Sequence, residues 1–247
     1  MTARPLRALE RLLLPNACVV CERGVADDDP DGLVCGLCRS RLRAVGSGCG
    51  RCQQPMPLIG PCRFCAEWPV VLGTVRSAVW LDATARPIVH HLKYDGLARA
   101  GADIARIVAR LVPAPARGIL VPVPLASRRR RQRGYNQAAA IAHALGSLWS
   151  RPVAEGVLSR ARDTGTQTAL SPAERLRNMA AAFAAARPET VPHAADEGLH
   201  PTIILVDDVL TTGATLVACV TALGQVGWPA VEAVTFARAM PYELRVA

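Results

Sequence analysis

Apolar and polar positions alternate with two different periods along residues 75–238, and the two periods predict strands and helices in turn. Short runs rich in Val, Ile and Leu predict buried strands, whereas apolar residues three or four positions apart predict amphipathic helices. The predicted strands cover residues 75–81, 118–124, 202–206 and 230–238. The predicted helices cover residues 82–96, 97–112, 136–149, 174–186 and 214–227, with Asn136 as an N-cap. Strands alternating with helices indicate an α/β fold, a mainly parallel sheet with helices on both faces.

The first 67 residues follow a different pattern, because they hold eight of the nine cysteines in four C-x-x-C pairs. Two thiolates at this spacing can close on one metal ion. The connecting segments, such as residues 26–32, are too rich in Gly, Pro and Asp to form a core unaided. A bound metal would supply the missing folding free energy, so we predict two structural zinc ions rather than a redox-active dithiol.

Pairing the cysteines in chain order assigns four ligands to each zinc: Cys18, Cys21, Cys35 and Cys38, then Cys49, Cys52, Cys62 and Cys65. Cross-braced pairing is an alternative that the spacing leaves open. The ninth cysteine, Cys219, lies in an apolar helical stretch and is expected to be a small buried thiol.

We divide the chain into a small zinc-ribbon module with an N-terminal helix, residues 1–67, and an α/β domain, residues 68–247. Leucines at helical spacing predict the short helix within residues 5–15, which stops at Pro15. Charged residues interrupt this stretch, so we do not expect a signal peptide. No apolar run reaches eighteen residues, so membrane insertion is not expected, and the cysteine usage favours a cytoplasmic protein.

The formal net charge of +9 favours anionic partners such as phosphates or nucleic acid. A zinc ion held by four thiolates brings a net charge of about −2, and two such sites would leave the chain at about +5. Aromatic residues make up only 4% of the chain, which counts against extensive stacking on nucleobases.

The stretch IILVDDVLTTGAT, residues 203–215, predicts a ligand site at the end of a strand. Ligands of open parallel sheets bind beyond the carboxyl ends of the strands, where Asp207 and Asp208 are placed. The turn that follows leads into a helix, whose N-terminal backbone N–H groups can bind a phosphate, and Gly213 permits close approach. Three threonines add hydroxyl donors: Thr211, Thr212 and Thr215. Carboxylates suit sugar hydroxyls or hydrated Mg²⁺, so the stretch fits a ribose 5-phosphate.

Two other interpretations of this stretch compete with the ligand site. A nucleoside triphosphatase would also place an acid after a strand, but it needs G-x-x-x-x-G-K-[ST], which the chain lacks. An acidic strand end that only caps a helix is the plainer alternative. The Thr-Thr-Gly-Ala-Thr turn at this offset favours the ligand site over that alternative.

ILVDDVLTTGAT resembles the phosphoribosyl pyrophosphate (PRPP) signature of type I phosphoribosyltransferases. The resemblance implies their fold, and it implies that Asp207 and Asp208 act as the catalytic acids that bind the ribose 2- and 3-hydroxyls. It further implies that PRPP binds with Mg²⁺ and that the 5-phosphate is bound by Thr211, Thr212, Gly213, Ala214 and Thr215.

Three further segments and the cysteine-rich module resemble one branch of that superfamily, the ComF-type competence proteins. The segments are HHLKYDG (90–96), VPVPLASRRRRQRGYNQA (121–138) and TQTALSPAERLRNMAAAF (166–183). The resemblance covers almost the whole chain. It implies a role in DNA uptake and natural transformation, with the uptake machinery as a partner.

The resemblance also implies where pyrophosphate binds. In the resembled fold the loop after the strand at 118–124 contacts it, which makes Pro124 and Ser127 candidates. Five arginines follow within residues 128–133, and Arg133 is the preferred ligand contact, while others are solvated or meet a separate polyanion. Gln167 and its neighbour Thr166 resemble part of a mobile loop that closes over PRPP, although a plain surface loop is an equal alternative. Lys93 resembles part of a hood over the ribose and is a further candidate.

The implied activity is that of a glycosyltransferase, more narrowly a pentosyltransferase that moves a phosphoribosyl group. The residues themselves identify no acceptor and no general base. The alternative is a non-catalytic module that senses PRPP and binds single-stranded DNA, which suits the zinc ribbons and the arginine cluster.

Overall fold

A computed structural model describes residues 17–25, 29, 32–94, 99–160, 182–191 and 202–241. Its centre is a four-stranded sheet in the order β1-β6-β5-β2. The strands are β1 (Leu72–Trp80), β2 (Ile119–Pro122), β5 (Thr202–Leu210) and β6 (Ala230–Arg238). Every neighbouring pair is parallel, which confirms the parallel α/β sheet that the sequence predicts.

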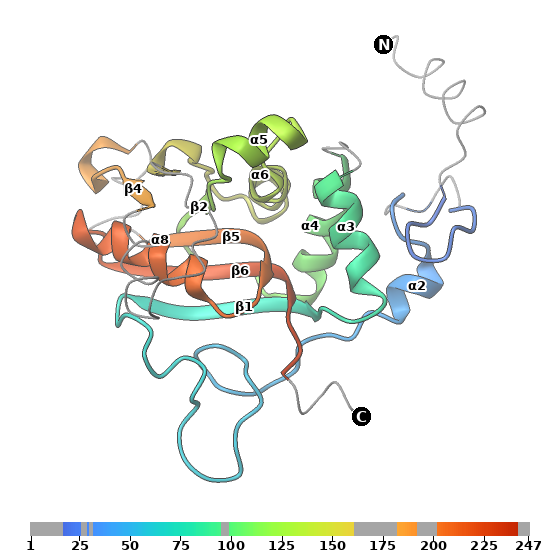
Figure 1. Ribbon diagram of the computed structural model, residues 1–247, viewed down its shortest axis with the longest axis horizontal. Helices are drawn as coiled ribbons and strands as arrows, with labels where there is room; N and C mark the ends of the chain where they lie inside the picture. The colour runs from blue at the N-terminus through green and yellow to red at the C-terminus, as the bar shows by residue number, and fades with distance from the viewer. Residues whose placement is uncertain are drawn as a thin grey trace.

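Helices cover both faces of this sheet, as expected (Figure 1). Successive residues in the middle of β5 enter two separate cores, because successive side chains in a strand point to opposite faces. Ile203 and Leu205 of β5 enter one core, whereas Ile204 and Val206 enter the other. The first core includes residues of α8 (Ala214–Gln225). The second includes residues of three helices: α3 (Ala85–Tyr94), α4 (Arg99–Leu111) and α6 (Gln137–Trp149).

Most of the predicted elements are confirmed with ends displaced by a few residues. Asn136 caps α6 as expected, because its side-chain oxygen accepts a hydrogen bond from the Ala138 N–H. At the end of α4, Leu111 is 44% exposed, whereas the next residue, Val112, is buried.

A pair of short antiparallel strands replaces part of the predicted helix over residues 174–186. Strand β4 (Phe183–Ala185) pairs with β3 (Leu158–Arg160). The alanines favour a helix locally, but pairing with a distant strand and burial of Phe183 override that propensity. The earlier part of the predicted helix, through residue 181, lies outside the described residues. Two 3₁₀ turns flank the strand pair, at Glu155–Val157 and Pro188–Thr190.

The arginine run, for which no helix or strand was predicted, forms the helix α5 (Ser127–Arg133). Arginine has high helix propensity, and Gly134, with φ of 79°, caps the helix by donating its N–H to the Arg130 carbonyl.

The cysteine-rich segment packs on the sheet rather than apart from it. Cys18 and Cys38 belong to the same core as α3 and α4, and Cys52 and Cys65 belong to the core on the opposite face. Only one short helix, α2 (Gly36–Ser40), forms among the described residues of this segment. The predicted helix within residues 5–15 lies outside the described residues, and the division at residue 67 stays a prediction.

None of the helices in the described parts of the chain combines the length and the hydropathy that crossing a bilayer requires.

Candidate ligand and metal sites

Strand β5 carries both acids of the predicted site. The strand continues past them to Leu210, because Asp207 and Val209 pair with Thr235 and Ala237 of β6. The Asp208 N–H donates to Asp207 Oδ1 at 2.8 Å. Burial and the neighbouring Asp208 charge raise the pKa of Asp207 to about 8, against the opposing effects of that hydrogen bond and of Lys93. The two carboxylates are therefore adjacent, as predicted, and one of them holds a proton near neutral pH.

Lys93, near the end of α3, neutralises the second acid. Its Nζ lies 2.9 Å from Asp208 Oδ2, and the two side chains are 25% and 13% exposed. The sequence marked Lys93 as a candidate substrate contact but did not predict this ion pair. A local pattern carries no signal for it, because the two residues come from elements far apart in the chain.

The turn after β5 has the geometry that its glycine suggests. Gly213 has φ of 81°, a left-handed conformation that favours glycine, and it is the N-cap residue of α8. Thr211 and Thr212 are exposed, and Thr212 Oγ1 accepts from the Ala214 N–H at 3.4 Å. The first backbone N–H groups of α8 thus follow directly after the acids, where an anion can be bound.

Gly213 is also required by packing, which the sequence did not predict. A Cβ at this position would lie 2.9 Å from Cζ2 of Trp68. The sequence explained the glycine by close approach to a ligand, and the structure adds an aromatic ring in contact with it.

The loop after β2 leaves the sheet beside the acids. The Val123 N–H donates to the Val206 carbonyl at 2.9 Å, next to Asp207 in the chain. Pro124 therefore begins this loop near the acid pair, and Ser127, which is exposed, is the first residue of α5. The structure brings this loop and the acids to one edge of the sheet, as parallel strands require.

The RGYNQ segment connects α3 to the same loop. The Tyr135 hydroxyl donates to the Leu92 carbonyl, and Asn136 Nδ2 donates to the Val123 carbonyl at 3.1 Å. The Arg133 guanidinium lies 5.3 Å from the centre of the Tyr94 ring. Arg133, the preferred pyrophosphate contact, is therefore partly occupied by an aromatic ring, and the segment holds the end of α3 over β5.

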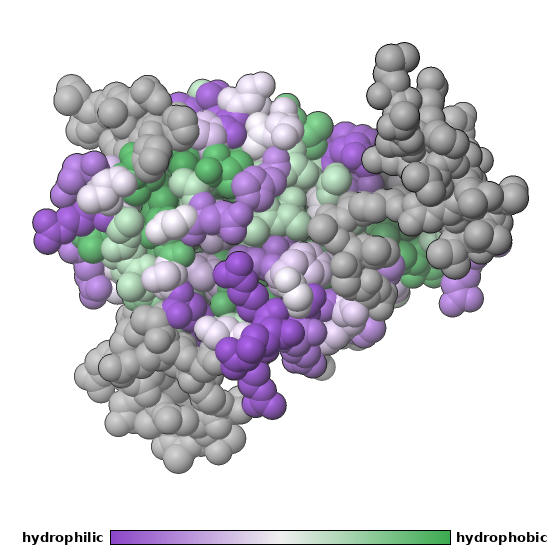
Figure 2. All heavy atoms as spheres, turned by 90° about the horizontal axis from the view of Figure 1, so that it is seen from above, coloured by the Kyte–Doolittle hydropathy of each residue, from purple (hydrophilic) through white to green (hydrophobic). Residues whose placement is uncertain are grey.

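The remaining arginines of α5 form an exposed cationic surface. Arg128 to Arg131 are all exposed. Figure 2 views the side on which α5 lies in Figure 1 and shows strongly hydrophilic side chains gathered over this helix. Gln167 and Thr166 lie outside the described residues, so their assignment to a loop that closes over PRPP stays a prediction.

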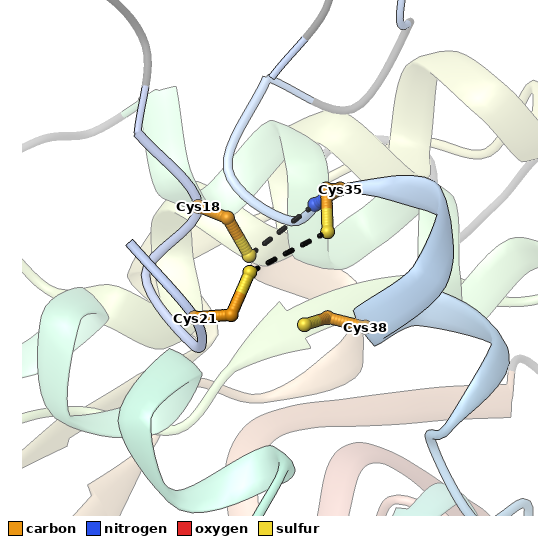
Figure 3. Close-up of side chains that lie close together, drawn as sticks. All are labelled: Cys18, Cys21, Cys35 and Cys38. Atoms are coloured by element: carbon orange, nitrogen blue, oxygen red, sulfur yellow. Dashed lines mark hydrogen bonds between the residues drawn. The ribbon is translucent and has the colours of Figure 1, made fainter. Parts of the chain in front are cut away.

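The first cysteine group converges from two loops and α2 (Figure 3). Its four sulfur atoms lie within 4.8 Å of one another, and the Sγ atoms of Cys21 and Cys35 are 3.8 Å apart. Backbone N–H groups, chiefly that of Cys35, outweigh burial and lower the pKa of Cys18 to about 7. The members are Cys18, Cys21, Cys35 and Cys38.

The second group has the same arrangement. Its Sγ–Sγ separations include 3.6 Å for Cys49 with Cys65 and 3.6 Å for Cys52 with Cys62. A disulfide would need about 2.05 Å, whereas four sulfurs tetrahedral around zinc at about 2.3 Å stand about 3.8 Å apart. All nine cysteines are free thiols. Both groups therefore fit a zinc ion, and pairing in chain order is confirmed: Cys49, Cys52, Cys62 and Cys65 form the second set.

Arg238, at the end of β6, is a residue of the second metal site that sequence reasoning missed. It is 1% exposed, its Nη1 donates to the Cys52 carbonyl, and its guanidinium lies 4.4 Å from the centre of the Phe64 ring. Burial lowers the pKa of Arg238, and negative charge on the nearby cysteines opposes that shift. A buried cation here offsets the negative charge of a metal bound by four thiolates.

Most of the sequence is similar to known proteins, although no family model matches it. The chain is 31% identical over 220 residues to DNA utilization protein YhgH of Salmonella typhi, covering 83% of this chain and 89% of the relative. It is 28% identical over 219 residues to competence protein ComFC of Bacillus subtilis, covering 81% and 85%. It is 29% identical over 190 residues to competence protein F of Haemophilus influenzae, covering 74% of each.

Proposed function

Because the chain belongs to the ComF family of competence and DNA utilization proteins, we propose that it binds PRPP with Mg²⁺ and works in DNA uptake or use in the cytoplasm. The observation that carries the PRPP site is the juxtaposition of the acid pair, the Gly213 turn and the loop after β2 at one edge of a parallel sheet.

Each part of this edge suits one part of the ligand. Asp207 and Asp208 would accept hydrogen bonds from the ribose hydroxyls. The Thr211–Thr215 turn and the N-terminus of α8 would bind the 5-phosphate. The loop from Pro124 to Ser127, with Arg133 beside it, would bind the pyrophosphate. Gln167 would approach from the segment that follows β3.

Because Asp207 is protonated before the ligand binds and Lys93 already pairs with Asp208, we expect ligand binding to change the protonation of the site. A cation or a sugar hydroxyl on the acids favours the ionised form, so binding would release the Asp207 proton. Calorimetry at pH 7 in two buffers of different ionisation enthalpy would detect this release as a difference in the apparent binding enthalpy.

Phosphoribosyl transfer follows as the proposed chemistry of this site. The C1–O bond of PRPP breaks, its electron pair leaves with pyrophosphate, and C1 bonds to a nucleophile on an acceptor. Mg²⁺, when bound, supplies charge neutralisation for the departing pyrophosphate. The acids hold the ribose, and Arg133 would stabilise the leaving group.

The direct test is the double substitution Asp207→Asn with Asp208→Asn. We expect at least a tenfold loss of PRPP affinity, because one ionised acceptor, that of Asp208, contributes about 1.5–3 kcal/mol and a tenfold loss needs only about 1.4 kcal/mol. The fold should survive, since the substitution leaves no cavity and removes only the Lys93–Asp208 ion pair, which is partly exposed. Calorimetric titration with PRPP and Mg²⁺, alongside thermal melts, checks both expectations. Wild-type affinity in a folded double variant would mean that the acids are structural.

A second activity, binding of single-stranded DNA, is favoured by the exposed arginines of α5. Four adjacent cations on one short helix suit a phosphate backbone without reading its bases. In this alternative the PRPP site senses the ligand without turnover. Incubation with PRPP, Mg²⁺ and a pooled metabolite extract separates the two, because only a transferase yields pyrophosphate and a new ribosylated product.

A further inference from the structure

Trp68 lies between the second cysteine group and the turn that follows β5. Its backbone N–H donates to the carbonyl of Cys65 at 3.2 Å. The guanidinium of Arg51 lies 5.9 Å from the centre of the indole, and the Phe64 ring packs edge-on with centres 5.4 Å apart. Arg51 lies between Cys49 and Cys52, and Phe64 between Cys62 and Cys65, so both contacts depend on the cysteine group.

The same ring also lies against the turn. A Cβ at Gly213 would lie 2.9 Å from Cζ2 and 3.3 Å from Nε1 of Trp68. Gly213 is the residue at which the Thr-Thr turn ends and α8 begins. Trp68 is only 7% exposed, so the indole is enclosed and cannot move without moving its neighbours.

Two arginines attach this cysteine group to the sheet. Arg51 donates to the carbonyls of Cys65, Trp68, Pro69 and Leu72, at distances from 2.6 to 3.2 Å. Arg238 at the end of β6 donates to Cys52 and to the side chain of Gln54. Metal ligands, indole and turn are thus linked by continuous packing and hydrogen bonds.

The first cysteine group lacks this connection in the described part of the chain. Its buried members pack with α3 and α4 in the core on the opposite face, and neither Trp68 nor α8 belongs to that core. The two groups have the same ligands but different neighbours, which makes one a matched control for the other.

We propose that Trp68 is a positioning residue through which the second cysteine group, holding its metal, sets the geometry of the phosphate-binding turn. The proposal rests on the proposed function for its consequence in PRPP binding. Loss of metal at the second group would loosen residues 211–218 and weaken PRPP binding, whereas loss at the first group would not.

The experiment compares Cys62→Ser with Cys35→Ser, and Trp68→Ala with Trp68→Phe, using Trp149→Phe as a control on the opposite core. Hydrogen exchange without ligand is measured for residues 211–218, with α6 amides as an internal reference, together with zinc content and PRPP affinity. We expect Trp68→Ala and Cys62→Ser to speed exchange in residues 211–218 at least tenfold relative to α6 and to weaken PRPP binding at least tenfold. Trp68→Ala should retain two zinc ions per chain, and Trp68→Phe should stay within threefold of wild type because it keeps an aromatic ring.

Each outcome decides the proposal. Unchanged exchange at residues 211–218 in Trp68→Ala would overturn it, as would equal acceleration in Cys35→Ser and Cys62→Ser. A loss in Trp68→Phe as large as in Trp68→Ala would show that the ring does not act by packing. If Cys62→Ser does not fold, Trp68→Ala decides alone. If the wild type does not bind PRPP, the proposed function fails, while the exchange data still decide whether Trp68 positions the turn.

Discussion

The Asp207 carboxyl lies in strand β5 next to Asp208, whose carboxylate is paired with the Lys93 ammonium. Two adjacent acids repel each other when both are ionised, and partial burial strengthens the repulsion. Two features reduce this repulsion. Asp207 keeps a proton to about pH 8, and the Lys93 ammonium neutralises the negative charge of Asp208. Strain of this kind is typical of residues retained for binding rather than for stability.

We predict that Asp207 makes folding less favourable as the pH rises. Its pKa is about 8 in the folded chain against an ordinary value of 3.8, so between these values the folded state binds the proton more tightly. The stability that this proton provides is complete below about pH 4 and is lost as the pH rises through 8. Relative to Asp207→Asn, the wild type should lose at most about 1.4 kcal/mol of unfolding free energy per pH unit. Urea denaturation of both proteins at pH 5.5, 6.5 and 7.5 checks this, and a constant difference would contradict it.

We predict that Lys93 and Asp208 are energetically coupled. In a double-mutant cycle with Lys93→Met and Asp208→Asn, the coupling should be about 1 kcal/mol, because both side chains are largely buried and folding alone brings them together. The helical pair Asp103 and Arg106 of α4 offers a control. There about 0.5 kcal/mol or less is expected, because residues three apart are already close in the unfolded chain.

Urea unfolding of the four proteins in each cycle gives both values. A Lys93–Asp208 coupling no larger than the control would mean that the ion pair does not constrain the site.

At the scale of elements, the end of α3 and the RGYNQ segment that follows α5 meet beside the loop after β2. The RGYNQ segment holds the end of α3 through Tyr135 and the loop after β2 through Asn136. Helix α5 contains no buried residue, so packing does not constrain its sequence and its side chains can be used for binding. Its basic last turn also suits the negative end of the helix dipole.

We predict that α5 provides the electrostatic part of single-stranded DNA binding. Replacing Arg128 to Arg131 with Ala should preserve the helix, since alanine has the highest helix propensity, and should weaken binding. The slope of log affinity against log salt should fall by about 0.7 for each DNA phosphate that the variant no longer neutralises. Fluorescence anisotropy of a labelled oligonucleotide across a salt series measures both effects.

The matched control removes four exposed arginines scattered elsewhere: Arg23, Arg63, Arg117 and Arg187. It changes the net charge by the same amount, so a local binding surface and a general charge effect are distinguished. Equal reductions of affinity in the two variants would contradict a site on α5.

On the scale of the whole molecule, each cysteine group packs into the core on one face of the sheet. Segments that cannot form a core alone are thereby joined to the two cores of the α/β sheet. Metal binding stabilises such segments by free energy that the apo chain lacks. Loss of a metal ion should therefore destabilise the α/β domain as well as residues 1–67.

We predict two zinc ions per chain, and one in each of Cys35→Ser and Cys62→Ser. Each variant should also melt at a lower temperature, because its ligands line a core that includes residues of the sheet. Cys219→Ala, which alters a buried thiol outside both groups, should keep two zinc ions. Elemental analysis of protein prepared without chelator, with calorimetric melts, is the measurement. One zinc or none in the wild type would contradict the prediction.

Features encoded within a few neighbouring residues could be predicted from the sequence. Apolar runs marked β5 and β6, Asn136 marked the start of α6, and the C-x-x-C spacing marked both metal groups. The acids and Gly213 were found in the same way, because a strand, a turn and a helix start are local patterns.

Contacts between residues far apart in the chain could not be predicted and became known from the folded arrangement. Strand β4 replaced a predicted helix because it pairs with β3, which lies far away in the sequence, and this pairing outweighs the helix propensity of alanine. Lys93 on Asp208, Trp68 on Gly213 and Arg238 on Cys52 join segments far apart in the sequence. Periodicity reports which face of an element is buried but not what covers it, and the energies of burial and charge pairing depend on the covering partner.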